Sequence, residues 1–389
     1  MLRHRLPKNC VHIFFRLIMN NVNIWEAYAN KTVLLTGHTG FKGSWLASWL
    51  TRLGAKVVGF SLDVPSTPSN FSASQVGECV EDIRSDIRDV AALRDVINRV
   101  QPDFIFHLAA QALVRRSYAE PLETISSNAL GTTSVLEALR SSQKPLVAVM
   151  ITSDKAYDNL EWVWGYRETD RLGGKDPYSA SKGMAELAIR SYVDSFFKES
   201  NNCVRLGIAR AGNVIGGGDW AADRIVPDCV RAWANHQSVD IRSPNATRPW
   251  QHVLEPLSGY LSLGANLQAN GEQHGEAYNF GPSSDQDNTV RALIDAMAMH
   301  WSEVRWNDVS KQEMDNREAG LLKLNCDKAL NELSWRATLR FEETVAMTAE
   351  WYKEYYSDNS KSMRNFTLGQ IETYMRLFDK RSLNSRCYD

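Results

Sequence analysis

The stretch TVLLTGHTGFKGSWLASWL, residues 32–50, decides the fold of this chain. A short apolar run leads into a turn in which Gly37, Gly40 and Gly43 recur at GxxGxxG spacing, and a helix-compatible pattern follows. Such a turn lets the backbone approach a pyrophosphate where a Cβ would clash, and the amides at the start of the helix meet its negative charge. Glycine spacing alone also describes a plain tight turn, but the position between a strand and a helix favours a dinucleotide-binding loop.

Short aliphatic or β-branched runs alternate with longer helix-compatible stretches from Lys31 to about Arg210. The runs are residues 33–36, 57–61, 104–107, 146–152 and 204–210. Their nearly continuous apolarity is typical of strands that are buried on both faces. The pattern predicts an α/β protein, with a Rossmann-type doubly wound parallel sheet and a smaller C-terminal α/β substrate-binding lobe.

The composition changes after Arg210, where Gly, Trp, Pro and Asn become frequent, with helical patterns at residues 291–301 and 341–352. We therefore expect four parts: a poorly ordered N-terminal extension, a dinucleotide-binding Rossmann domain, a substrate-binding lobe and a loosely attached polar tail. Their expected bounds are residues 1–24, 25–210, 211–356 and 357–389. The basic N-terminal segment has a short apolar stretch, but Arg16 interrupts it, so we expect no export signal. We expect residues 1–18 to be dispensable, with Met19 as the functional start.

The charge balance and the cysteines narrow the class of protein. The 389 residues include 44 basic and 46 acidic side chains, a formal net charge of -2, without long runs of one sign. This balance is not that of a nucleic-acid-binding protein, and no uncharged apolar run is long enough to span a membrane. The six cysteines are scattered without a CxxC motif or metal-ligand spacing. We therefore expect no metal site, and reduced thiols in the cytoplasm.

The residues after the second predicted strand indicate which dinucleotide is bound. Asp63 ends the run VVGFSLD, where an acidic side chain can hold the adenosine ribose, although an exposed loop acid is the alternative. The stretch SLDVPSTPSN, residues 61–70, has no Arg or Lys for a second phosphate, which favours NAD over NADP. Asp86 and Ile87 follow a further short run, where they can contact the adenine ring or, alternatively, begin a helix.

The stretch DPYSASKGMAELAIRSYV, residues 176–193, carries the strongest catalytic signal. Tyr178 and Lys182 are four residues apart, hence on one face of a helix that Asp176 caps and Pro177 opens. A phenol with an ordinary pKa of about 10 acts as a base near neutrality only if a nearby ammonium stabilises the phenolate, which Lys182 can do. The YxxxK pattern alone is a weak signal, but after a glycine-rich loop it predicts a catalytic pair.

A second set of polar residues, Ser153, Asp154 and Lys155, follows the apolar run that ends near Thr152. Ligands of open α/β sheets bind at the carboxyl ends of the strands, so we expect Ser153 to hydrogen-bond a substrate hydroxyl. Asp154 and Lys155 are then available for proton transfer. A Ser-Asp pair after a strand is, alternatively, a helix cap.

With these residues in place, the chain resembles the extended short-chain dehydrogenase/reductase superfamily and, within it, the CDP-glucose 4,6-dehydratase family. The resemblance runs from about Trp25 to Tyr352 and rests on six stretches: TGHTGFKGSWL, HLAAQALVRRSY, TSDKAYDNLEWVWGYRE, DPYSASKG, RAGNVIGGGDW and RPWQHVLEPLSGY. It implies an NAD site built from Gly37, Thr39, Gly40, Phe41, Gly43, Asp63, Asp86, Ile87, Leu108, Ala109, Ala110, Gln111, Asn128, Thr152, Tyr178 and Lys182.

The resemblance also implies a reaction, the conversion of CDP-glucose to CDP-4-keto-6-deoxyglucose. C4 is oxidised, water is lost across C5 and C6, and the hydride returns to C6 without net use of NAD. Tyr178 would take the O4 proton, Ser153 would polarise O4, and Asp154 would protonate the leaving hydroxyl. The dTDP-glucose relatives look like they carry Glu where this chain has Lys155, which must be neutral to accept the C5 proton. Tyr157 or a water is the alternative base.

The expected partner is a nucleotide-sugar, with Asn213, Arg224 and Arg248 as candidate substrate-binding residues. Arginine suits a diphosphate because its planar fork bonds phosphate oxygens in pairs, although ordinary surface arginines are the alternative. We expect no nucleic-acid or membrane partner, and a homodimer or homotetramer. Two other functions stay open: an epimerase or reductase on the same scaffold, for which Asp154 is dispensable, and a dinucleotide-binding protein without catalysis.

Overall fold

The computed structural model describes residues 23–199, 202–283, 286–302, 304–310, 321–357 and 362–386. The expectations for residues 1–18 and Met19 lie outside these described residues. None of the helices in the described part of the chain is long and apolar enough to cross a membrane.

A seven-stranded sheet with the strand order β11-β6-β5-β4-β1-β2-β3 forms the centre of the molecule, and all of its neighbouring strands are parallel. The strands are β1 (Thr32–Thr36), β2 (Lys56–Ser61), β3 (Glu81–Arg84), β4 (Phe104–His107), β5 (Leu146–Ile151), β6 (Val204–Ala211) and β11 (Ala277–Phe280). The five predicted runs are confirmed as β1, β2, β4, β5 and β6. The edge strand β3 was not predicted because its sequence, EDIR, is polar at three of its four positions.

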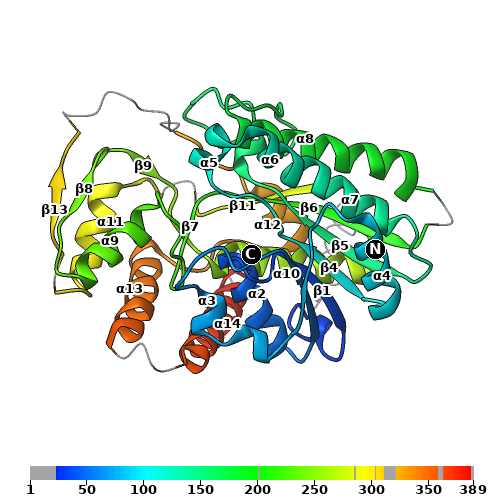
Figure 1. The fold of residues 1–389 in the computed structure, drawn as a ribbon, viewed down its shortest axis with the longest axis horizontal. Helices are drawn as coiled ribbons and strands as arrows, with labels where there is room; N and C mark the ends of the chain where they lie inside the picture. The colour runs from blue at the N-terminus through cyan, green and yellow to red at the C-terminus, as the bar shows by residue number, and fades with distance from the viewer. Residues whose placement is uncertain are drawn as a thin grey trace, which may run out of the picture.

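Successive residues of each strand face opposite layers of helices. In β1, Val33 and Leu35 belong to the core beneath α2 and α10, whereas Leu34 belongs to the core beneath α4, α7 and α8. Figure 1 shows α7 and α8 on one side of the sheet and α2 and α14 on the other. The helices of the first half are α2 (Phe41–Arg52), α3 (Asn70–Ala73), α4 (Val90–Val100), α5 (Val114–Ala119), α6 (Pro121–Ile125), α7 (Gly131–Leu139) and α8 (Pro177–Tyr192). The doubly wound architecture is therefore confirmed.

The second lobe consists of short strand pairs and helices that gather at one end of the molecule (Figure 1). The strand pairs are β7 (Val214–Ile215) with β10 (Gln251–His252), β9 (Thr247–Arg248) with β12 (Asn288–Thr289), and β8 (Val239–Ile241) with β13 (Trp306–Asp308). The helices after β6 are α9 (Ile225–Ala234), α10 (Leu254–Ala269), α11 (Val290–Ala298), α12 (Asp327–Leu333), α13 (Phe341–Ser357) and α14 (Arg364–Arg386). The helices expected near residues 291–301 and 341–352 are confirmed as α11 and α13. The single turns of 3-10 or π helix are η1 (Glu26–Tyr28), η2 (Val76–Glu78), η3 (Ser126–Leu130), η4 (Asp154–Ala156) and η5 (Val193–Phe197).

The C-terminal segment differs from the expected loosely attached tail. Its polar composition concealed a helix, α14, of which Ile371 and Tyr374 are fully buried against the core. The Tyr374 hydroxyl donates a hydrogen bond to Glu255 at the start of α10, at 2.7 Å. The same carboxylate accepts the amides of Thr338 and Leu339, so Glu255 joins three segments of the C-terminal half. The apolar residues of α14 are few, but they lie on the side that meets α2 and α10.

We expect Glu255→Leu to lower the free energy of unfolding by about 3 kcal/mol, because three buried donors lose their acceptor. The shift of the unfolding midpoint in urea measures this loss. Glu372→Leu is the matched control, since this exposed carboxylate only pairs with Arg52 on the surface and should contribute less than about 1 kcal/mol. Equal effects of the two substitutions would show that Glu255 does not fasten α14.

Candidate active site

The glycine turn between β1 and α2 excludes side chains by close contact. Gly37 has a φ of +77°, and a Cβ on it would lie 2.7 Å from the backbone nitrogen of Ala109, in the loop after β4. A Cβ on Gly43 would lie 2.0 Å from the carbonyl oxygen of Gly37. α2 begins at Phe41, and its N-cap residue Gly40 has no side chain to cap the first amides. Uncapped amides at a helix start attract an anion, as the pyrophosphate site requires.

The loop after β2 is tied to this turn. The Thr39 hydroxyl donates to the carbonyl oxygen of Asp63 at 2.6 Å, and the His38 ring lies between the Ser61 hydroxyl at 2.8 Å and the Asp82 carboxylate at 2.9 Å. Burial lowers the pKa of His38, while Asp82 opposes this effect. Ser61 is engaged with His38, whereas Asp63, the expected ribose contact, is exposed after β2.

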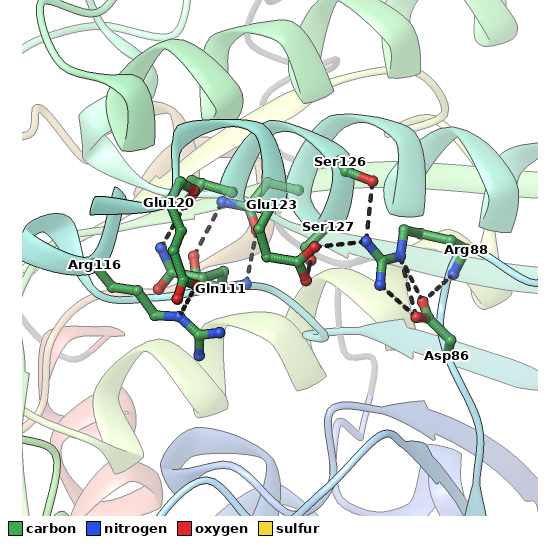
Figure 2. Close-up of polar contacts among 10 residues, drawn as sticks. Asp86, Arg88, Gln111, Arg116, Glu120, Glu123, Ser126 and Ser127 are labelled. Atoms are coloured by element: carbon green, nitrogen blue, oxygen red, sulfur yellow. Dashed lines mark hydrogen bonds and ion pairs between the residues drawn. The ribbon is translucent and has the colours of Figure 1, made fainter. Parts of the chain in front are cut away.

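Asp86 and Ile87 occupy the loop between β3 and α4. Arg88 holds the Asp86 carboxylate at 2.6 Å and bonds Glu123 of α6 at 2.8 Å, which is visible in Figure 2. The hydrogen bonds from Arg88 lower the pKa of Asp86. Ile87 is buried against the start of α7. The N-cap of α4 is Asp89, so the alternative role of Asp86 as that cap is excluded.

The loop after β4 is fastened to α8 through one amide side chain. Asn128 accepts the Gln111 amide at 2.8 Å, donates to the Gln111 carbonyl at 3.0 Å and donates to Ser181 of α8 at 2.8 Å. This arrangement fixes the loop after β4 beside Gly37. The order of the strands reverses between β1 and β4, and dinucleotides bind parallel sheets at such a point. The other loop residues expected to contact NAD are Leu108, Ala109 and Ala110.

Ser153, Asp154 and Tyr178 come together at the carboxyl end of β5, and all three are buried. The Ser153 hydroxyl donates to Oδ1 of Asp154 at 2.8 Å and accepts the Lys155 amide at 3.2 Å as the cap of η4. It also acts to lower the pKa of Tyr178. Ser153 is thus the local cap considered as the alternative, and it acts on both the carboxyl and the phenol.

The electrostatics of the Tyr178–Lys182 pair differ from the simple expectation of a lowered phenol pKa. Burial raises the pKa of Tyr178 to about 12, and the opposing effects come from Ser153 and Arg224. Burial lowers the pKa of Lys182 to about 8, against the effect of Glu186. The Lys182 Nζ lies 5.9 Å from the centre of the Tyr178 ring. In the chain alone, desolvation of the phenol therefore outweighs the help that it receives from neighbouring cations.

Burial also raises the pKa of Asp154, and the neighbouring Lys155, Ser153 and Lys42 oppose this rise. A carboxyl group held toward its protonated form is suited to act as an acid.

Lys42 is a site residue that sequence reasoning missed. It is the second residue of α2, and its pKa is lowered to about 8 by burial and by the nearby Arg224 and Lys182, while Asp154 raises it. The signal was available in the sequence, because Lys42 lies inside the glycine-turn motif. The charge of Lys42 opposes the rise in the pKa of Asp154.

The three predicted substrate-binding residues lie at different places. Arg224 precedes α9 and pairs with Asp219 at 2.8 Å, and its charge acts to lower the pKa of Tyr178. Arg248 lies in β9 and donates to the Thr247 carbonyl at 2.8 Å. Asn213 is exposed directly after β6.

A buried ion pair supports the catalytic helix. Glu186 follows Lys182 by one turn of α8, and its carboxylate bonds Arg210 of β6 through two contacts of 2.6 Å. Thr152 donates to the same carboxylate at 2.7 Å. This network, which the sequence analysis did not identify, ties α8 to the ends of β5 and β6.

Tyr157 is the alternative base, and its phenol is already engaged in the same network. It donates to Asn279 at 2.8 Å and accepts from Arg210 at 2.7 Å. Burial raises the pKa of Tyr157. A phenol held in this way is a poor proton acceptor, so Lys155 and a water stay as the candidates for the base.

The parallel sheet, the glycine turn at the β1 and β4 ends and the Ser153, Tyr178 and Lys182 cluster define an enzyme of the extended short-chain dehydrogenase/reductase class. A model of the GDP-mannose 4,6 dehydratase family matches residues 34–348. The chain belongs to this family.

Individual relatives agree with this assignment. The CDP-glucose 4,6-dehydratase of Salmonella typhimurium is 46% identical over 341 residues, which cover 87% of this chain and 94% of that protein. The structure of a UDP-glucose-4-epimerase from Stenotrophomonas maltophila has a TM-score of 0.73 at 20% identity, covering 84% of this chain and 99% of that one. A dTDP-glucose 4,6-dehydratase from Streptomyces venezuelae gives 0.69 at 24% identity, covering 84% and 98%. The two structures show the shared fold.

We expect Glu186→Gln to lower the free energy of unfolding by about 3–5 kcal/mol, because Arg210 keeps a buried charge without a counter-charge. The double variant Glu186→Gln with Arg210→Met should recover most of this loss, as thermal and urea unfolding can measure. Glu120→Gln, which breaks an exposed pair with Arg116, is the control and should cost less than about 1 kcal/mol. No recovery in the double variant would contradict the ion-pair explanation.

Proposed function

We propose that this chain is a nucleotide-sugar 4,6-dehydratase that acts on CDP-glucose with bound NAD. The observation that carries the proposal is the buried Asp154, which lies beside Tyr178 and has a raised pKa. A sugar epimerase or reductase needs the Tyr178 and Lys182 pair but no separate acid. The name of the Salmonella typhimurium relative supports CDP-glucose as the substrate.

The described residues fit a dinucleotide. Gly37 and Gly43 let the turn pack directly against the loop after β4 and against itself, the uncapped start of α2 favours the charge of a pyrophosphate, and Asp63 is exposed after β2. The remaining residues that we propose for this site are Thr39, Gly40, Phe41, Asp86, Ile87, Leu108, Ala109, Ala110, Gln111, Asn128 and Thr152. Bound NAD would supply hydride acceptance at C4 and hydride return to C6.

In the first step, Tyr178 takes the proton from the sugar O4, which Ser153 holds through a hydrogen bond. The phenol must become more acidic than it is in the chain alone, where burial raises its pKa to about 12. Lys182 and Arg224 supply positive charge for the phenolate, and bound oxidised NAD would add to it. Proton removal from O4 would therefore require bound NAD.

In the second step, water is lost across C5 and C6. The ketone at C4 makes the C5 proton acidic, and Lys155 accepts that proton. Asp154 donates its proton to the C6 hydroxyl as the C6–O bond breaks. Lys155 and Asp154 are neighbours in the chain, and the Lys155 charge lowers the pKa of Asp154, so proton transfer at one group changes the proton affinity of the other.

The diphosphate of the substrate requires cations on the side of the second lobe. The charge of Arg224 acts on Tyr178, and Arg248 precedes Pro249, which lines the same pocket as Asp154. We assign the diphosphate to these two arginines, with Asn213 at the rim.

A cytoplasmic homodimer or homotetramer is part of the same proposal. Cys79, Cys203, Cys229 and Cys326 are free thiols, which suits a reducing compartment. Several apolar side chains on α6, η3 and α8 are exposed and suit a helix-to-helix interface between copies. They are Leu122, Leu130, Met184 and Leu187.

Incubation with CDP-glucose and a trace of NAD tests the function, with mass spectrometry as the measurement. We expect a product that has lost one water, without stoichiometric NADH. Asp154→Asn should block water loss while C4 oxidation continues, whereas an epimerase would barely respond. If dTDP-, UDP- and GDP-sugars as well as CDP-glucose gave no dehydrated product, the proposal would be refuted.

Lys155→Met should slow elimination by at least about 100-fold, because a general base typically contributes about 10² to 10⁴ in rate. Single-turnover measurement of water loss gives the rate, and Lys56→Met at the exposed start of β2 is the control. A loss of less than about tenfold would remove Lys155 from the proton transfer.

A further inference from the structure

The loop between β3 and α4 begins beside the end of β2. The two strands are parallel neighbours, with Ser61 paired to Arg84, and the Ser85 amide donates to the Ser61 carbonyl at 3.0 Å. Asp63 and Asp86 therefore follow two adjacent strands at the same edge of the sheet, the edge at which such sheets bind dinucleotides. A base attached to a ribose at Asp63 is thus within reach of the loop that carries Asp86.

Arg88 holds the Asp86 carboxylate through both of its oxygens (Figure 2). The amide and the Nε of Arg88 donate to Oδ1 at 2.9 Å, and Nη2 donates to Oδ2 at 2.6 Å. The Nε hydrogen also reaches Oδ2, at 3.1 Å. A carboxylate has about four acceptor sites. The three N–H groups of Arg88 fill Oδ1 and leave one acceptor site on Oδ2.

The guanidinium of Arg88 is itself fixed by neighbouring helices. Its Nη1 donates to Glu123 of α6 at 2.8 Å and to the Ser126 hydroxyl of η3 at 3.1 Å. The Arg88 carbonyl accepts the Ser134 hydroxyl of α7 at 3.3 Å. All three nitrogen atoms of the guanidinium therefore donate within the protein. Arg88 is thus placed to act on a ligand through Asp86 and not by direct contact.

The Asp86 side chain is accessible to a ligand, since 33% of it is exposed. The hydrogen bonds from Arg88 lower the pKa of Asp86, so the carboxylate is ionised near neutrality and can only accept hydrogen bonds. Ile87, the next residue, is buried against Gly131 at the start of α7 and fixes the loop. The loop therefore presents an acceptor, and the exocyclic amino group is the donor by which adenine complements it.

We propose that Arg88 is a positioning residue for the cofactor, which orients Oδ2 of Asp86 toward the adenine amino group of NAD. The inference rests on the NAD site of the proposed function. Glu123 holds the guanidinium in turn, so the adenine end of the site is anchored on α6. Because a carboxylate attracts an amino group and repels a keto oxygen, the Asp86 and Arg88 pair selects adenine over a 6-oxo purine.

Calorimetric titration with NAD and with nicotinamide hypoxanthine dinucleotide tests the inference. The two dinucleotides have the same charge, but hypoxanthine carries a keto oxygen where adenine has its amino group. We expect the wild type to bind NAD at least about 10-fold more tightly, the effect of one hydrogen bond to a charged group. Arg88→Met should reduce this ratio to below about threefold, because Asp86 is then no longer held in place.

Three further variants separate positioning from charge. Arg88→Lys keeps the positive charge but cannot hold both carboxylate oxygens with a planar fork, so it should lose the base preference as the methionine variant does. In Asp86→Ala, which lacks the acceptor, the added Arg88→Met should leave the ratio unchanged. Arg94→Met is the matched control and should keep the wild-type ratio, since Arg94 of α4 bonds Glu137 of α7 at 2.9 Å.

Equal weakening of both dinucleotides in Arg88→Met would show that Arg88 acts through its charge or on the fold, and would overturn the inference. Equal binding of the two dinucleotides by the wild type, or a full base preference in Arg88→Lys, overturns it as well. If the wild type prefers NAD and the Arg88 variants keep that preference, the NAD site stands and only the role of Arg88 is refuted. Failure of the wild type to bind NAD refutes the site itself.

Discussion

The ion pair between Glu186 and Arg210 is the constraint on which the catalytic side of the structure depends. Both side chains are fully buried, so each charge requires the other. The pair joins α8 to β6, and Thr152 adds the end of β5 through the same carboxylate. Tyr178 and Lys182 lie on α8, while Asp154 follows β5. The relative position of phenol and carboxyl is therefore fixed by a polar contact in the core, beneath the site and away from solvent.

Much of the fold was predictable because it rests on local patterns. The glycine turn needed residues without Cβ atoms, the buried strands needed continuous apolar runs, and α8 needed Asp176 and Pro177 at its start. β3 and α14 escaped prediction for one physical reason: each has few apolar residues, and only their tertiary neighbours show which side is buried. β11, whose sequence is AYNF, escaped because Asn279 interrupts its apolar run.

The Tyr178 and Lys182 pair was predictable because its proposed proton transfer requires two side chains four residues apart on one face of a helix. Lys42 has no such spacing. Its charge acts on Asp154 because the start of α2 lies on the same side of the folded sheet as the residues after β5. The pKa shifts of the site residues were the property that the sequence predicted least well. The residue types suggested an acidic phenol, whereas the burial of Tyr178 raises its pKa, and burial is a property of the whole fold.

The position of β11 has a consequence for how the protein is made. This strand pairs with β6, but α9 and α10 both lie between the two strands in the chain. During synthesis, the sheet can assemble as far as β6 while its partner has not yet left the ribosome. The backbone of β6 is then an open edge with unpaired N–H and C=O groups, a surface prone to join other chains. The nascent protein thus passes through a stage in which a chaperone has a defined strand to protect.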